Sequence, residues 1–235
     1  MLAYRFQNIL PEIIGPDQTG CIKGRYIGEN IRVTHDLIHL TTLKDIPGIL
    51  LLVDFEKAFD TIRWSYMHKV LESYNFGENL QRWIKILYSK PETTVMNNGI
   101  TCGFFKISRG IQKGCPLSAL LFILCVEALA LRIKNEKNIK GIPTISGEVK
   151  ISQYVDDTVC FLQDRQSVNR VMTIFRDFYQ ASGLKANLEK TSYYQMNSQQ
   201  PICMQNLGIA ESGLHPLILG IKLALNEIDN LNLNY

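Results

Sequence analysis

Two adjacent aspartates stand between two short β-prone stretches, and this arrangement limits the fold more than any other feature of the sequence. The stretches 149–153 and 158–162 are rich in β-branched and aromatic residues, and they flank Tyr154-Val155-Asp156-Asp157. So short a connection favours a hairpin with both acids at its tip. Neighbouring carboxylates repel each other, so the pair is costly at a turn unless a cation binds there.

A third acid, Asp54, follows the apolar run Ile-Leu-Leu-Leu-Val at 49–53. This run is too short for a confident helix and is typical of a strand buried on both faces. If it lies beside the hairpin, the three acids meet at one edge of a sheet. Oxygen ligands of this kind suit Mg²⁺, and two divalent ions roughly 3.5–4 Å apart support nucleotidyl transfer. An Asp-Asp pair alone is more often a solvated turn, so the spacing of the other motifs must decide.

Apolar residues recur at helical spacing in several segments, and a further hairpin is indicated between them. Helices are predicted at 28–43, 64–74, 80–87, 116–131 and 168–178, with Gly183 ending the last one. Residues 93–109 predict a hairpin with its turn at Asn97-Asn98-Gly99, and residues 184–188 alternate like an edge strand. Interleaved helices and strands that include a hairpin favour an α+β fold over a doubly wound parallel sheet.

Composition adds few limits. A chain of 235 residues that is 46% hydrophobic can bury the core of one large domain or two small ones. A net charge of +3 is too small to identify a nucleic-acid binder by itself. The six cysteines are scattered, which indicates buried reduced thiols rather than a zinc site or disulfides.

Two segments were considered as targeting or membrane sequences. The N-terminus lacks the long apolar region of a secretory signal, so we expect an intracellular protein of the nucleus or cytoplasm that is not secreted. The apolar run 116–131 contains Ser118 and Glu127 and is shorter than the ~20 residues that span a bilayer. It is interpreted as a buried core helix, and no membrane partner is expected.

Several ordered motifs closely resemble those of reverse transcriptases from LINE-type (non-LTR) retrotransposons. They are LLVDFEKAFD (51–60), GIQKGCPLSALLF (110–122), YVDD (154–157) and SGLKANLEKT (182–191), preceded by DQTGCIKGR (17–25) and ENIR (29–32). The resemblance covers roughly the first 195 residues. It implies a right-hand polymerase palm, an antiparallel sheet packed on helices, with partial fingers and no thumb.

The resemblance also implies a division of the chain. Residues 1–48 would be partial fingers, 49–88 the first part of the palm, 89–112 a fingers/palm hairpin, 113–205 the second part of the palm, and 206–235 a degenerate primer-grip-like tail. In that tail, Ile218-Leu219-Gly220 stands where the family has Tyr-Leu-Gly.

The activity implied is RNA-directed DNA polymerisation, which adds deoxynucleoside triphosphates to the 3′-hydroxyl of a DNA primer on an RNA template. Two Mg²⁺ ions, or Mn²⁺ in their place, would be held by Asp54 and Asp156, with Asp157 and the Phe55 carbonyl in support. Lys190, or with less support Lys185, resembles the lysine that protonates departing pyrophosphate.

Other matched positions imply binding roles. Phe59 would lie under the sugar and exclude a 2′-hydroxyl, and Gly114 would let the backbone approach the nucleotide. Lys113 stands beside it where the family usually has glutamine. The basic side chains of Lys23, Arg25 and Arg32 would meet phosphates.

Two other functions are weighed against this one. A catalytically silent retrotransposon remnant, or a nucleic-acid-binding fold, is favoured by the family segments missing at both ends, whereas the intact acids favour the polymerase. An RNA-templated RNA polymerase shares the metal chemistry but is disfavoured by Phe59.

Overall fold

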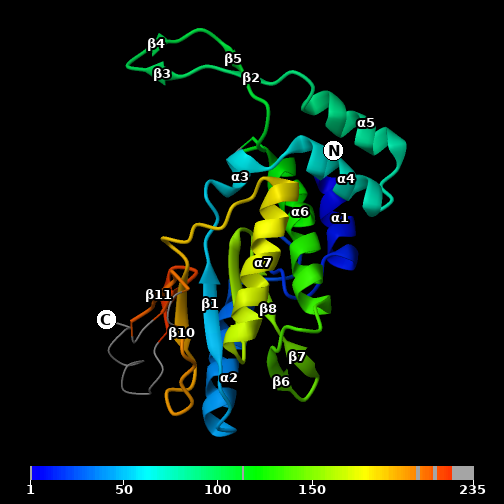
Figure 1. Cartoon of the computed structure of the whole chain (residues 1–235). Coiled ribbons are helices and arrows are strands. Elements are labelled where there is room, and N and C mark those ends of the chain that lie inside the picture. Colours follow the sequence, from blue (N-terminus) through cyan, green and yellow to red (C-terminus); the bar gives the residue numbers. More distant parts are fainter. Residues whose placement is uncertain (1, 113, 205–206, 214–215, 224–235) are drawn as a thin grey trace.

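The centre of the molecule is a five-stranded sheet in the order β11-β10-β1-β9-β8 (Figure 1). The computed structural model describes residues 2–112, 114–204, 207–213 and 216–223. The strands are β1 (Ile49–Val53), β8 (Ile151–Tyr154), β9 (Asp157–Leu162), β10 (Ser192–Gln195) and β11 (Ala210–Glu211). Only the β10–β11 pair is parallel within this sheet. The strand at 49–53, the acidic hairpin and the α+β class are therefore confirmed.

β1 lies in the middle of the sheet and is covered on both faces. Ile49, Leu51 and Val53 belong to the larger hydrophobic core, whereas Leu50 belongs to a second, smaller one. Alternate side chains of a strand point to opposite faces, so the two cores lie on opposite sides of the sheet. This double burial explains why the run is apolar throughout instead of alternating.

Helices α6 (Pro116–Asn135) and α7 (Arg165–Ser182) pack on the larger core, together with α1 (Leu2–Ile13) and α4 (Trp64–Ser73). Pro116 begins α6 as predicted, because the first turn of a helix needs no backbone donor there. Gly183 ends α7 with a φ of 84°, a left-handed conformation that favours glycine.

α6 is longer than the 116–131 run predicted from sequence. Among the described residues it is the one helix long and apolar enough to cross a membrane, yet 72% of its most apolar window is buried inside the protein. Burial on this scale supports its interpretation as a core helix.

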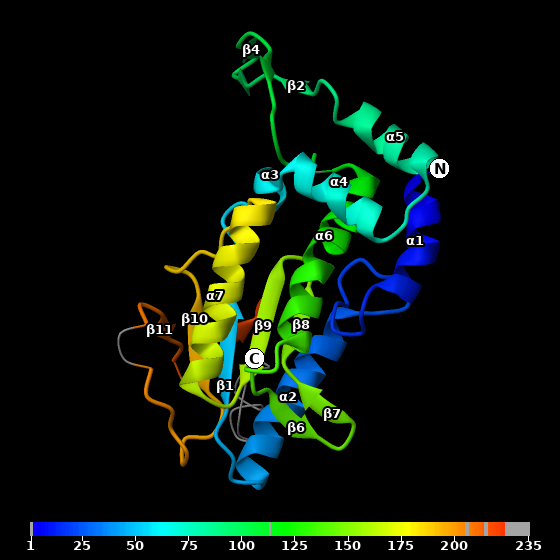
Figure 2. The same ribbon diagram turned by 45° about the vertical axis from the view of Figure 1, so that its right-hand side comes forward.

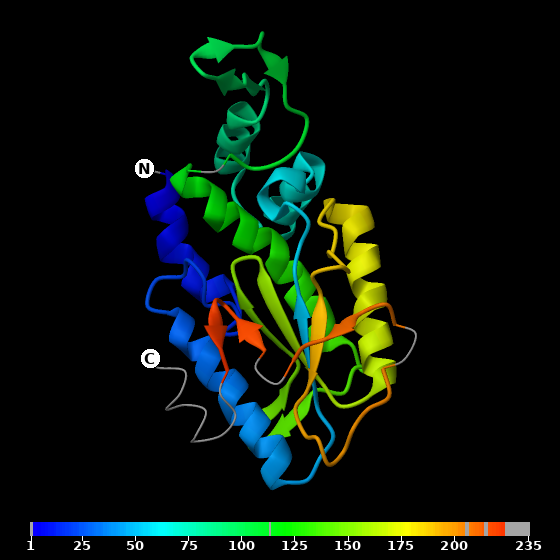
Figure 3. The ribbon, with the colours of Figure 1, turned by 90° about the vertical axis from the view of Figure 1, so that its left-hand side faces the viewer.

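The opposite face of the sheet carries α2 (Ile27–Leu43) and a hairpin of β12 (Leu217–Ile218) and β13 (Ile221–Lys222). Figure 3 shows this hairpin, coloured red, lying next to α2. Its turn residues Leu219 and Gly220 both have positive φ, as a tight type I′ hairpin requires. The hairpin falls in the predicted primer-grip-like tail, of which residues 206, 214–215 and 224–235 lie outside the described part of the chain.

An arm projects away from the sheet (Figure 1, Figure 2). It comprises β2 (Glu92–Thr93), β3 (Met96–Asn97), β4 (Ile100–Thr101) and β5 (Phe105–Lys106), and its turn at Asn98-Gly99 confirms the predicted hairpin. The remaining elements are α3 (Ala58–Thr61), α5 (Glu78–Leu87), β6 (Ile142–Thr144) and β7 (Gly147–Val149).

Four predictions need correction. Residues 184–188 form no strand, because they pair only through an isolated bridge of Ala186 with Phe55, beyond the end of β1. Val149 belongs to β7 and not to the strand before the acids. Trp83, expected in the core, is 58% exposed because α5 buries Ile84 alone. The cysteines are only partly buried: Cys125 and Cys160 are inside, but Cys21, Cys102 and Cys203 are exposed.

Candidate active site

The sheet brings its three acidic strand ends to the same edge. β1 and β9 are antiparallel with Val53 opposite Thr158, so the next pair in this register is Asp54 and Asp157. In the hairpin of β8 and β9, Tyr154 pairs with Asp157, which leaves Asp156 in a two-residue turn. The three aspartates predicted from sequence therefore lie at one end of neighbouring strands.

The carboxylates influence one another electrostatically. The pKa of Asp157 is raised, first by burial and then by the negative charges of Asp156 and Asp54. Like charges that raise a pKa in this way are stabilised by a bound cation. Within the described residues no group of three or more His, Cys, Asp or Glu side chains is arranged so that it could hold a metal ion by itself. Mg²⁺ fits such an open set of oxygen donors, because it retains waters and needs only one or two protein carboxylates.

Asp54 and Asp157 line a cleft between the sheet and the β12–β13 hairpin. One pocket of about 140 Å³ is lined by Asp54, Asp157 and Lys190 on one side and by Leu217 and Ile218 on the other. A second pocket of about 310 Å³ is lined by Tyr154, Asp157, Ile27 at the start of α2, and the turn of the same hairpin. Asp54 and Asp157 thus border open space next to the β12–β13 hairpin.

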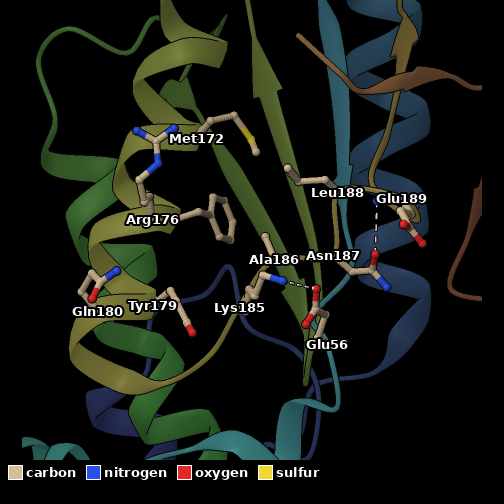
Figure 4. Close-up of a pocket in the computed structure, with 11 residues that line it drawn as sticks. Glu56, Met172, Arg176, Tyr179, Gln180, Lys185, Ala186, Asn187, Leu188 and Glu189 are labelled. Atoms are coloured by element: carbon tan, nitrogen blue, oxygen red, sulfur yellow. Dashed lines mark hydrogen bonds and ion pairs between the residues drawn. The ribbon is translucent and has the colours of Figure 1, made fainter.

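A larger pocket lies elsewhere, between α7 and the segment 185–189 (Figure 4). It measures about 660 Å³, and its lining includes Met172, Arg176 and Tyr179. Neither Asp54 nor the Asp156-Asp157 pair lines it. The candidate active site is the smaller cleft, because it holds the acidic side chains that metal-dependent chemistry would need.

The two candidate lysines point to different partners. Lys190 Nζ lies 3.9 Å from Asp54 Oδ2. Lys185 Nζ instead pairs at 2.7 Å with Glu56, and both residues line the larger pocket (Figure 4). The segment between the two lysines is attached to the end of β1, because the Asn187 N–H donates a hydrogen bond to the Asp54 carbonyl at 2.8 Å. This geometry favours Lys190 for a role at the carboxylates.

Phe59 lies in α3, a short distance along the chain from Asp54. Its ring is half-buried and stacks on Phe122 of α6, with centroids 4.5 Å apart and an angle of 19° between the planes. Phe122 is fully buried, and its ring packs against one face of the Phe59 ring. Phe55 is itself buried and packs against Phe175.

The predicted binding residues have varied surroundings. Gly114 has a φ of 85° with open space around it, so the backbone conformation and not the surrounding space favours glycine there. Lys113 lies outside the described residues. Lys23 is exposed, and Arg32 is exposed with only a weak ion pair to Asp36 at 3.7 Å.

Arg25 is used for structure. Its guanidinium donates to the carbonyl oxygens of Pro11, Ile14, Gly15 and Gln18, which closes the C-terminal end of α1. These bonds use the guanidinium N–H groups that would bind a phosphate. The prediction that Arg25 contacts a phosphate is therefore wrong.

Sequence reasoning passed over Gln18, although it stands in the quoted motif DQTGC. Gln18 is 1% exposed. Its side-chain amide forms hydrogen bonds with the backbone of Val155, in the turn that carries Asp156. Its uncharged side chain and its distance along the chain gave no signal of this contact.

Comparison with known proteins identifies the family. Residues 1–210 match the family model described as "Reverse transcriptase (RNA-dependent DNA polymerase)". The chain belongs to the reverse transcriptase family. Similar proteins include the transposon TX1 149 kDa protein of Xenopus laevis, 28% identical over 193 residues, which cover 81% of this chain and 15% of that protein. Another is the Pol polyprotein of the retrotransposable element R2DM of Drosophila melanogaster, 26% identical over 138 residues, which cover 59% of this chain and 13% of that protein.

These relatives confirm the expected LINE-type reverse transcriptase resemblance, and this reverse transcriptase chain spans only a small part of each of them.

Solved structures confirm the palm-type fold. Telomerase of Candida albicans matches with a TM-score of 0.65 at 11% identity, over 94% of this chain and 36% of that one. Telomerase of Candida tropicalis matches with a TM-score of 0.63 at 12% identity, over 95% of this chain and 43% of that one.

The raised pKa of Asp157, caused first by burial and then by the charges of Asp156 and Asp54, predicts that Asp157→Asn stabilises the reverse transcriptase chain when divalent ions are absent. A carboxyl whose folded-state pKa is raised stabilises the fold below its unfolded-state pKa, and this contribution is lost as pH rises through the folded-state pKa. At neutral pH the variant should therefore gain about 1 kcal/mol or less, because the Asp157 side chain is only partly buried and still reaches solvent that screens its charge. The gain should vanish in acid, where Asp157 is protonated, and should be reversed by Mg²⁺.

Thermal unfolding of parent and variant in a chelating buffer, at neutral and acidic pH and then with Mg²⁺, measures this difference. Equal stability at neutral pH without ions would show that neither burial nor the neighbouring charges destabilise the ionised Asp157 carboxylate.

Proposed function

We propose that this reverse transcriptase chain is an RNA-directed DNA polymerase domain. In this reaction the primer 3′-oxygen forms a bond to the α-phosphorus of a deoxynucleoside triphosphate, and the bond from that phosphorus to pyrophosphate breaks. The observation that supports the proposal best is the meeting of Asp54, Asp156 and Asp157 at one edge of a reverse transcriptase fold.

Asp54 and Asp156 would hold two Mg²⁺ ions, or Mn²⁺ in their place, with Asp157 and the Phe55 carbonyl in support. Bound ions of this kind activate the 3′-hydroxyl and neutralise the triphosphate. The cleft beside Asp54 and Asp157 gives substrate access to these donors.

Other residues would place the substrates. Phe59, supported by Phe122, would contact the sugar, and the open turn at Gly114 would leave room for the nucleotide. The exposed side chains of Lys23 and Arg32 are available to template or primer phosphates.

Primer extension on an RNA template tests the proposal. The chain is incubated with a DNA primer annealed to RNA, the four deoxynucleotides and Mg²⁺, and the products are sized. We expect extension that stops when Mg²⁺ is chelated. Tight binding of the duplex without any extension would instead support the alternative, a silent remnant that binds nucleic acid.

Lys190→Ala is expected to slow nucleotide addition far more than Lys185→Ala. Lys190 lies near Asp54, where it could protonate departing pyrophosphate, and general acid catalysis contributes roughly 100-fold or more. Lys185 is the matched control, since it pairs with Glu56 instead. Single-turnover rates of the two variants measure the difference, and equal rates would exclude Lys190 as the proton donor.

A further inference from the structure

The turn that carries Asp156 is held by a side chain from a distant part of the chain. Gln18 Oε1 accepts a hydrogen bond from the Val155 N–H at 2.9 Å, and Gln18 Nε2 donates to the Val155 carbonyl at 3.2 Å. The same Oε1 accepts the Gly20 N–H at 2.9 Å. One buried amide therefore satisfies both backbone groups of a single turn residue, and only a side chain with a donor and an acceptor can do this.

Val155 needs such support because its backbone is in an unfavourable conformation. Its φ is 57°, in the left-handed region that β-branched residues rarely adopt. Conformations of this kind persist only where the surrounding structure imposes them, and they are frequent at functional sites. Asp156 follows Val155 directly in the same turn, and Asp157 begins β9 after it, so the strained residue lies next to both carboxylates.

Backbone pairing attaches the segment that carries Gln18, residues 15–20, to the outer edge of β8. The Gln153 N–H donates to the Asp17 carbonyl at 2.7 Å, and the Thr19 N–H donates to the Gln153 carbonyl at 3.0 Å. These bonds add a short strand-like pairing next to the catalytic hairpin.

The same segment is anchored to α6 on its other side. The Gly15 N–H donates to the carboxylate of Glu127, a residue that is 2% exposed, and Lys134 pairs with Asp17. The Arg25 guanidinium fixes the Gly15 and Gln18 carbonyls. The segment that carries Gln18 is thus held by backbone bonds to β8 on one side and by charged side chains of α6 on the other.

Close packing leaves no room for the turn to shift toward this segment. A Cβ atom on Gly20 would lie 2.5 Å from the backbone nitrogen of Val155, nearer than real contacts allow. The absence of a side chain at Gly20 therefore lets the segment and the turn meet.

We propose that Gln18 is a positioning residue for the catalytic carboxylates, which acts by holding Val155 in its left-handed conformation and so directs Asp156 and Asp157 toward the divalent ions. The role of Gln18 in metal binding rests on the proposed function. The contact between Gln18 and Val155 can be tested without activity or metal.

The first test is amide hydrogen exchange of Val155, measured by NMR in the parent chain and in Gln18→Met. Methionine keeps the length of the side chain but cannot accept or donate these bonds. We expect much faster exchange at Val155 in the variant, with exchange in β1 and β9 unchanged. Unchanged protection of Val155 would overturn the proposal.

The second test is binding of Mn²⁺, followed by electron paramagnetic resonance. Groups that orient metal ligands typically contribute 10- to 100-fold in metal affinity, and we expect roughly that loss in Gln18→Met. Asn197→Ala is the matched control, because Asn197 is a buried amide that bonds Ile46 and Asp45, near the opposite end of β1. It should bind Mn²⁺ as the parent does.

A rescue variant separates positioning from a general loss of structure. Glycine adopts positive φ without cost, so adding Val155→Gly to Gln18→Met should restore most of the Mn²⁺ affinity. Failure of the rescue, or an equal loss of affinity in Asn197→Ala, would contradict a positioning role.

Different results would contradict the proposed function and the role of Gln18. A parent chain that binds no Mn²⁺ would contradict the proposed function, and the exchange of the Val155 amide would then decide for or against the contact by itself. Normal Mn²⁺ affinity in Gln18→Met would leave the proposed function standing and overturn the role of Gln18.

Discussion

Replacing Asp156 with asparagine is expected to lower the rate of RNA-templated nucleotide addition by about a thousandfold or more, while duplex binding is retained. Asparagine has nearly the same shape, but its neutral amide cannot balance the charge of two divalent ions. Metal ions supply several kcal/mol to such a transition state, and each ~1.4 kcal/mol changes the rate tenfold. The turn position of Asp156 leaves few packing contacts to lose.

Single-turnover rates and fluorescence anisotropy with a labelled RNA–DNA duplex separate the two effects. Asp177→Asn is a matched control, since Asp177 is an exposed acid on α7 that pairs with Arg132. It should extend primers like the parent. If Asp156→Asn also keeps the parent rate, Asp156 is not a metal ligand.

Phe59→Val is expected to reduce the preference for deoxynucleotides over ribonucleotides by about tenfold or more. The Phe59 ring would reject a 2′-hydroxyl by steric overlap, and the buried ring of Phe122 behind it prevents it from moving aside. Valine keeps an apolar surface but opens space where the hydroxyl would lie. Loss of the stacked pair should also destabilise the fold, by up to about 3 kcal/mol.

The quantity to measure is the ratio of incorporation efficiencies for the two kinds of nucleotide, because the fraction of folded protein cancels in it. Phe178→Val provides the control: Phe178 is a buried ring on α7 that contacts Tyr66. It should lose stability without a change in the ratio. An unchanged ratio in Phe59→Val would mean that Phe59 serves only as core packing.

The parts of the fold predicted correctly were those in which a local pattern has one solution. The apolar run at 49–53 must be buried on both faces, and two acids in a short β-prone connection favour a hairpin tip. Trp83 and the segment 184–188 failed because their structure depends on neighbours. Trp83 lies on a helix that no other described element covers on that side, and Ala186 finds its partner at Phe55 rather than on the edge of the sheet.

The candidate site divides in the same way. Its carboxylates could be predicted because charge repulsion and motif spacing both point to a cation. Arg25 could not be assigned correctly, since an arginine that binds backbone carbonyls has the same sequence signal as one that binds phosphate. Gln18 was missed because its partners are the backbone groups of Val155, which no sequence motif displays.

The central claim is that the edge of the sheet bearing Asp54 and Asp156 is the polymerase active site. An experimental structure of the chain with an RNA–DNA duplex, Mg²⁺ and a non-hydrolysable deoxynucleotide tests it most directly. The account predicts that the α-phosphate lies beside the carboxylates of Asp54 and Asp156, with the sugar against Phe59. A nucleotide bound instead in the larger pocket beneath α7, between Arg176 and Lys185, would contradict it.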